Sequence, residues 1–190
     1  MVFNSQLALF AVFFGILFLY FKKGFLHHFF GLLWLLFLPN TIYMITDMIH
    51  LLRQWGRVDE GIKLILLVQY FILEFVCVVT YLYGMVPFEK QLLKRRLSEV
   101  QKVWLLIAFN FVIAFGMVLG RIERVNSWDV FVNPMGVLES VYNTIISPFH
   151  LLLLVLFGLF INCLYFLFRD YMIRIAHVVR RRKAENRITK

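Results

Sequence analysis

Charged side chains are scarce in this chain. Asp, Glu, Lys and Arg make up 16% of its 190 residues, whereas hydrophobic residues make up 62% and the mean hydropathy is +0.80. Soluble globular domains carry about 25% charged residues, so this composition excludes that class. No stretch rich in Gly, Ser or Pro divides the chain. We therefore expect one all-α domain, over residues 1–168, of a polytopic membrane protein.

Cysteines are few, and known reaction motifs are missing. Cys77 and Cys163 both lie in apolar runs, which argues against a disulfide framework. The sequence contains no HExxH, no GxSxG and no cysteine-based zinc spacing. It also lacks a Gly-rich phosphate loop, which argues against a nucleotide-driven machine. Any chemistry must be inferred from the polar side chains that interrupt the apolar segments.

Five apolar segments are long enough to cross a membrane, at about residues 4–21, 25–52, 62–85, 102–120 and 142–168. The first has no basic n-region and no small-residue cleavage pattern, so we expect a retained span and not a signal peptide. Pro39 interrupts the second segment. We interpret that segment as a single long helix, kinked or tilted, because a re-entrant hairpin would reverse the side of the later basic loop.

Basic residues are divided unevenly between the two sides that five crossings define. One side receives Lys22, Lys23, the loop 89–102 and a basic tail over residues 169–190, and holds 15 of the 20 basic but only four of the 11 acidic residues. The positive-inside rule then places the N-terminus outside and the C-terminus in the cytoplasm of a cell membrane. We expect the tail to bind anionic inner-leaflet headgroups, at about 1 kcal/mol per basic residue, and not nucleic acid.

A polar stripe runs through the second segment, at Asn40, Tyr43, Asp47, His50 and Gln54. On one helix, at about 100° per residue, these positions fall within a narrow arc. A charged side chain at the centre of a bilayer costs roughly 2.5–3.5 kcal/mol on insertion scales. Such a cost is usually tolerated where the side chains face a cavity, a partner or a ligand. We therefore look for function in this stripe.

Further polar groups converge on the same side of the membrane. Glu74 lies in the third segment and His150 in the fifth, after a second expected kink at Pro148. The preceding loop adds charged and polar residues, namely Arg121, Arg124, Asn126, Trp128 and Asp129. We predict catalytic roles for Asp47, His50, Glu74 and His150, and substrate binding by Asn40, Tyr43 and those loop residues.

Two chemistries fit this set of residues. Asp47, His50 and His150 could ligate a divalent metal such as zinc, which accepts imidazole nitrogen and carboxylate oxygen. Alternatively, Asp47 could orient His50 as a metal-free general base. Structural roles are the alternative to both: a local Asp47–His50 hydrogen bond, a protonated Glu74 bonded to a neighbouring helix, and arginines that bind lipid phosphate.

Residues 33–51 resemble the signature of a known family of bacterial membrane proteins. The pattern PNxxYxxTDxxH of that signature is matched by Pro39, Asn40, Tyr43, Thr46, Asp47 and His50. The segment from Gly120 to Asp129 resembles the second signature of that family, which is catalogued as a domain of unknown function, number 1361. The resemblance implies a bacterial integral membrane protein of several helices and implies no activity.

Three classes of function remain open from the sequence. The first is a hydrolase or transferase acting on a lipid or lipid-linked substrate at the outer leaflet. The second is a non-enzymatic module that binds a lipid or solute, or supports a partner complex. In addition, the chain could form a homo-oligomer. The third is an ion-coupled transporter, because intramembrane Asp, Glu and His residues often relay protons.

Overall fold

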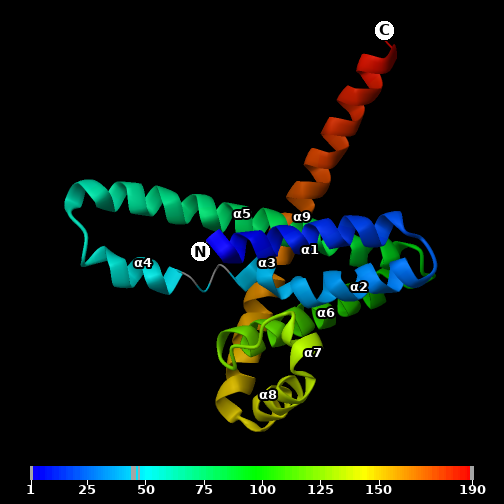
Figure 1. Cartoon of the computed structure of the whole chain (residues 1–190). Coiled ribbons are helices and arrows are strands. Elements are labelled where there is room, and N and C mark those ends of the chain that lie inside the picture. Colours follow the sequence, from blue (N-terminus) through cyan, green and yellow to red (C-terminus); the bar gives the residue numbers. More distant parts are fainter. Residues whose placement is uncertain (1, 44–45, 47, 189–190) are drawn as a thin grey trace.

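The computed structural model describes residues 2–43, 46 and 48–188, with side chains for residues 5–42, 46, 48 and 50–170. This part of the chain contains helices and no strands, which confirms the expected all-α class (Figure 1). The α-helices are α1 (Val2–Tyr20), α2 (Phe25–Phe37), α3 (Pro39–Tyr43), α4 (Met48–Trp55), α5 (Glu60–Leu93), α6 (Glu99–Arg121), α7 (Asp129–Val132), α8 (Pro134–Ile146) and α9 (Pro148–Ile188).

Most of the expected spans coincide with long apolar helices. By length and composition, four helical stretches of the described chain can cross a bilayer: Phe25–Ile42, Glu60–Leu93, Glu99–Arg121 and Pro148–Asp170. The fifth expected span, 4–21, corresponds to the shorter apolar helix Ser5–Tyr20. Helix α1 as a whole has 19 residues and extends about 28 Å at 1.5 Å per residue, which is close to the hydrocarbon thickness of a typical bilayer.

Aromatic side chains hold the first two helices together as an antiparallel pair. The ring centroids of Phe14 and Phe37 are 5.4 Å apart, and those of Phe18 and Trp34 are 5.6 Å apart in a stacked arrangement. The Trp34 indole N–H also donates a 2.8 Å hydrogen bond to the carbonyl of Gly84, in α5. The abundant phenylalanines of the sequence thus fix α1 and α2 to each other and to the bundle.

Glycines let the helices approach closely at two crossings. A Cβ atom added at Gly116 in α6 would lie 2.4 Å from Cγ of Pro39 in α3. A Cβ atom at Gly158 in α9 would lie 2.2 Å from the ring of Phe111 in α6. Small residues at such crossings are the usual means by which membrane helices pack. Helix α6 is therefore held between α3 and α9.

The turns of the bundle define two ends. The end that contains the α1–α2 turn (residues 21–24), the α5–α6 turn (94–98) and Arg169 is called the basic end. The other end, with residues 40–43, 46 and 120–127, is called the cavity end (Figure 1). Glu89 and Arg169 meet at the basic end, where Oε1 and Nε are 3.4 Å apart. At the cavity end, the Asn40 amide donates a 2.9 Å hydrogen bond to Oγ of Ser127.

The second expected span, 25–52, is divided among helices α2, α3 and α4, and Thr46 alone is described between the last two. Helix α3 ends at Tyr43, and α4 begins separately at Met48. The stretch Phe25–Ile42 alone has the length of a span, so the more polar residues that follow are not needed to complete the crossing. The polar stripe therefore does not form one helical face, because Asn40 lies on α3 and His50 on α4.

The last expected span is also divided. Helix α8 ends at Ile146, Ser147 has an extended backbone (ψ 114°), and α9 starts at Pro148. Proline cannot donate the backbone hydrogen bond that would continue α8, so the expected kink is a complete break. The segment predicted as a basic tail, 169–190, continues α9 as a helix to Ile188 within the described residues.

Candidate functional site

The cavity end is built around the break between α2 and α3, where carbonyl groups of the backbone accept hydrogen bonds from side chains. Pro39 lacks an N–H group, so the helical hydrogen-bond pattern is interrupted there. Side chains bond to the neighbouring carbonyl groups. The Ser127 hydroxyl donates to the carbonyl of Leu36 (2.9 Å), and the Asn40 amide donates to the carbonyl of Phe37 (3.2 Å) as well as to Ser127. The loop after α6 is thereby attached to this break.

Three further contacts shape that loop. The Asp129 carboxylate accepts a 2.6 Å hydrogen bond from the backbone N–H of Asn126. The Arg121 guanidinium donates to the carbonyl of Thr46 (3.2 Å), in the segment between α3 and α4. Arg124 adopts a left-handed backbone conformation (φ 58°), which is uncommon for a residue other than glycine and costs about 1–3 kcal/mol. The surrounding contacts must offset that cost.

A cationic hollow, called here the arginine cavity, opens beside this loop. It encloses about 430 Å³ and is lined by His50, Gly120, Arg121, Arg124 and Asn126. None of these five lining residues is acidic. Two guanidinium groups and an imidazole thus face one space that is large enough for a small anionic group. Guanidinium groups bind carboxylate and phosphate oxygens through paired, charge-assisted hydrogen bonds.

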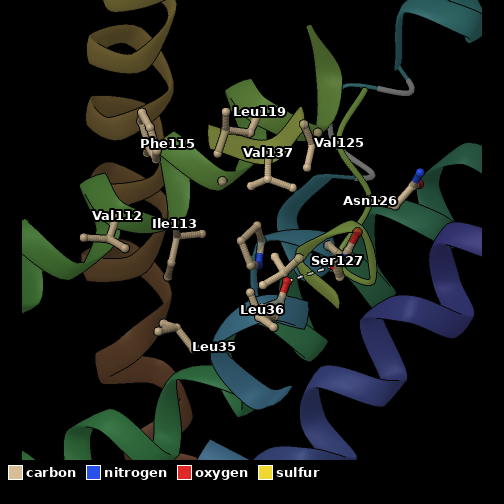
Figure 2. A pocket seen from close by; sticks show the side chains of 15 residues that line it. Leu35, Leu36, Val112, Ile113, Phe115, Leu119, Val125, Asn126, Ser127 and Val137 are labelled. Atoms are coloured by element: carbon tan, nitrogen blue, oxygen red, sulfur yellow. Dashed lines mark hydrogen bonds between the residues drawn. The ribbon is translucent and has the colours of Figure 1, made fainter. Parts of the chain in front are cut away.

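An apolar hollow, called here the apolar cavity, adjoins the arginine cavity. It encloses about 240 Å³ between α2, α3, α6, α7 and α8. Figure 2 shows Leu36, Ile113, Leu119 and Val137 around one common space, with Ser127 at its edge. The two cavities share the lining residues Gly120 and Asn126. The site therefore combines a cationic part with a neighbouring hydrophobic part.

A third hollow lies on the other side of Arg124. It encloses about 280 Å³ and includes the acidic residues Glu123, Asp129 and Glu139 among its lining. His150 faces Glu123, with Nδ1 and Oε1 3.5 Å apart and both side chains less than one-fifth exposed. His150 thus pairs with an acidic residue of the loop and does not line the arginine cavity.

The structure gathers part of the predicted site. His50, Arg121, Arg124 and Asn126 line the arginine cavity, and Asn40 lines the apolar cavity. Asp129 supports the loop through Asn126. The half-buried Glu74 lies on α5, and the partly exposed Trp128 directly precedes α7; neither lines the two cavities. Asp47 and the side chain of Tyr43 lie outside the described residues.

The described residues do not provide the expected zinc site. Among them, no three His, Cys, Asp or Glu side chains are grouped in a way that could hold a metal ion. His50 shares its cavity with two arginines, whose positive charge opposes a bound cation, and His150 faces Glu123. We therefore derive no step of the chemistry through a metal.

Comparison with known families gives one match, to the family described as "Protein of unknown function (DUF1361)", over residues 3–164. The chain belongs to this family. The match covers most of the chain and confirms the family resemblance seen in the sequence. Neither the curated proteins nor the solved structures contain a significant match to the chain. Membership of DUF1361 assigns no activity, so the function must be inferred from the site.

Sequence reasoning missed a second polar cluster, deep in the bundle of this DUF1361 protein. The Tyr81 hydroxyl donates to Oδ1 of Asn110 (2.7 Å), and the Asn110 amide donates to Oδ1 of Asn162 (3.0 Å). Closer to the basic end, the Tyr165 hydroxyl bonds to Glu89. Single asparagines within long apolar runs were the available signal, because an amide in hydrocarbon requires a partner.

Proposed function

We propose that this protein binds a membrane amphiphile with an anionic headgroup at its cavity end. The headgroup occupies the arginine cavity, and part of a hydrocarbon chain occupies the apolar cavity. The observation that carries this proposal is the adjacency of the two cavities, which share Gly120 and Asn126 in their walls. Phosphate and carboxylate headgroups share the required oxyanion chemistry.

The charge distribution supports an anion as the ligand of the arginine cavity. Arg121 is held in place by its bond to the Thr46 carbonyl, and Arg124 is held by a strained loop. Fixed guanidinium groups lose less conformational entropy on binding than mobile ones. The neighbouring His50 adds a donor, and Asn126 adds an amide. These groups surround a headgroup with donors of hydrogen bonds.

The size of the apolar cavity supports a chain as its occupant. Pockets for whole drug-sized ligands enclose about 300–1,000 Å³, and the apolar cavity, at about 240 Å³, is smaller. It reaches from Ser127 at the cavity end to Leu35 and Val112, further into the spans. A volume of this size suits a segment of one chain, with the rest of the ligand in the bilayer.

Lipid binding to the purified full-length protein tests the headgroup assignment. Native mass spectrometry would compare phosphatidylglycerol with phosphatidylcholine of the same chains. Arg124→Gln should weaken phosphatidylglycerol binding about tenfold, because a hydrogen bond to a charged group contributes about 1.5–3 kcal/mol. Arg57→Gln removes the same charge from an exposed position outside both cavities and should leave affinity unchanged. Equal affinity for the two lipids in the wild-type protein would contradict the proposal.

A pair of neighbouring substitutions tests the chain assignment. Val137 lines the apolar cavity, whereas Leu138 is 61% exposed on the other side of α8. Val137→Phe should reduce the affinity for long-chain phosphatidylglycerol and leave binding of glycerol phosphate unchanged. Leu138→Phe should affect neither ligand. Equal loss for both ligands in Val137→Phe would indicate a distorted site and would count against a chain in this cavity.

A hydrolase or transferase acting on such a lipid is the second candidate. The observation that favours it is the presence of His50 in the arginine cavity, where an imidazole could act as a general base or acid. Asp47, Glu74 and His150 keep their predicted catalytic roles in this candidate. Incubation with bacterial lipid extract, followed by mass spectrometry, should then show a product that His50→Gln abolishes while lipid binding is retained. Unchanged lipid in the wild-type sample would reject it.

Our proposal places the protein in the bacterial cytoplasmic membrane as a multi-pass protein, with the cavity end outside. The support is the excess of Lys and Arg at the basic end and in the C-terminal segment. The ligand is then an outer-leaflet lipid, and the basic C-terminal segment 169–190 contacts anionic inner-leaflet headgroups. Labelling of single cysteines at residues 57 and 95 in intact cells, with an impermeant maleimide, should modify position 57 only.

A further inference from the structure

Helix α8 has an apolar stripe that faces away from the protein. Met135, Leu138, Tyr142 and Ile145 follow helical spacing and are 55–73% exposed. The opposite side of the same helix packs inward, where Thr144 is fully buried and Val137 lines the apolar cavity. A stripe of this kind on a short helix requires an apolar environment.

The length and position of α8 exclude a complete crossing. Its 13 residues extend about 20 Å, whereas the hydrocarbon core is about 30 Å thick. The following helix starts at the level of the cavity end, because His150 contacts Glu123, just after the end of α6. Residues 134–146 therefore precede the span and lie beside the loop, and Figure 1 shows α8 below α2 and α6.

We propose that α7 and α8 lie in the plane of the membrane, at the headgroup–hydrocarbon boundary of the leaflet at the cavity end, with this stripe immersed in lipid. The apolar helix α9 that follows also exposes large apolar side chains in its first turns, namely Phe149, Leu152 and Leu156. Trp128 and Tyr142 are the residue types that favour this boundary. In-plane helices of this kind bury their apolar face about 5–10 Å deep.

This arrangement makes α7 and α8 the lipid-facing wall of the apolar cavity. Val130 and Val137 line that cavity from the inside, while the stripe contacts lipid on the outside. The separation between a bound chain and the bilayer is then one helix thick. The membrane position of α8 does not depend on the proposed ligand, and the following experiment contains none.

Spin labels on single cysteines test the position of α8 in vesicles of phosphatidylcholine alone. The background would carry Cys77→Ser, which retains the donor to the Thr41 carbonyl, and Cys163→Ala. Collisions with oxygen, which concentrates in hydrocarbon, would be compared with collisions with a water-soluble nickel chelate. Labels at positions 135, 138, 142 and 145 should all report the same shallow depth, whereas the label at 139 should report water.

Labels at positions 149, 152, 156 and 159 on α9 provide the depth scale, because depth should increase steadily along that helix. If α8 belonged to the crossing, depth would also change steadily from 135 to 145, which would overturn the proposal. Free access of the nickel chelate to all α8 positions would place the helix in water and would also overturn it. Low collision with both reagents would indicate contact with a second copy and would have the same consequence.

Discussion

Two polar regions of this protein differ in what their side chains contact. In the buried network, Tyr81, Asn110 and Asn162 bond to one another across three helices. At the cavity end, Arg121, Arg124 and His50 line an open volume of about 430 Å³. Polar residues that bond to one another stabilise a bundle, whereas the cationic residues at the cavity end border an open space as well as contacting the protein, as Arg121 does at the Thr46 carbonyl.

The largest effect is expected from removing both cations of the arginine cavity. Arg121→Gln combined with Arg124→Gln should lower the affinity for phosphatidylglycerol about 100-fold or more, because each charged hydrogen bond contributes about 1.5–3 kcal/mol. The midpoint of thermal unfolding should change little. Native mass spectrometry and thermal unfolding of the same samples measure the two quantities. A large fall in stability without a loss of affinity would mean that the two arginines stabilise the fold, as the buried network does, and do not bind the lipid.

The buried network should show the opposite behaviour. Asn110→Leu removes the partner of Tyr81 and of Asn162 and leaves polar groups in hydrocarbon. We expect the free energy of unfolding to fall by about 1–3 kcal/mol, because hydrogen bonds between membrane helices contribute up to about 1.7 kcal/mol each. Lipid affinity should not change. Tyr81→Phe, which removes only one donor, should produce a smaller fall in stability under the same denaturation.

A smaller effect is expected from the contact that joins the loop to the helix break. Ser127→Ala removes the bonds to Asn40 and to the Leu36 carbonyl. Without these bonds the loop is held less firmly, so the free energy of binding phosphatidylglycerol should weaken by about 1 kcal/mol, which corresponds to about fivefold in affinity. The matched control is Ser98→Ala, which removes the N-cap of α6 at the basic end. That control should lower stability by about 0.5–2 kcal/mol and leave affinity intact.

The long spans could be predicted from the sequence because length and absence of charge are sufficient signals. The predicted segments 62–85 and 102–120 lie within Glu60–Leu93 and Glu99–Arg121. The positions of two interruptions could also be predicted, but their form could not. Pro39 and Pro148 mark positions where a helix is interrupted, but whether a kink or a new helix follows depends on tertiary contacts such as that between Ser127 and Leu36.

The site could be predicted only in part. Arg121, Arg124 and Asn126 are predicted because the loop after the fourth expected span is rich in charged and polar residues, and they line one cavity with His50. The apolar cavity could not be predicted from the sequence, because its lining residues Leu36, Ile113 and Val137 do not differ in type from other residues of an apolar segment. His150 satisfied the same rule as His50, yet faces Glu123. The free-energy cost of a polar side chain in hydrocarbon indicates that the side chain needs a partner, but it does not indicate which residue or ligand that partner is.

The hydrogen bond between Asn40 and Ser127 also bears on how the protein is made. The two residues are 87 positions apart in the chain. At ribosomal speeds of about 5–20 residues per second, roughly 4–17 s separate their synthesis. During that interval the α2–α3 junction is already available for insertion, while the hydroxyl that bonds to its Leu36 carbonyl does not yet exist. Completion of this junction must therefore follow the synthesis of α6, so the two cavities beside it are assembled late.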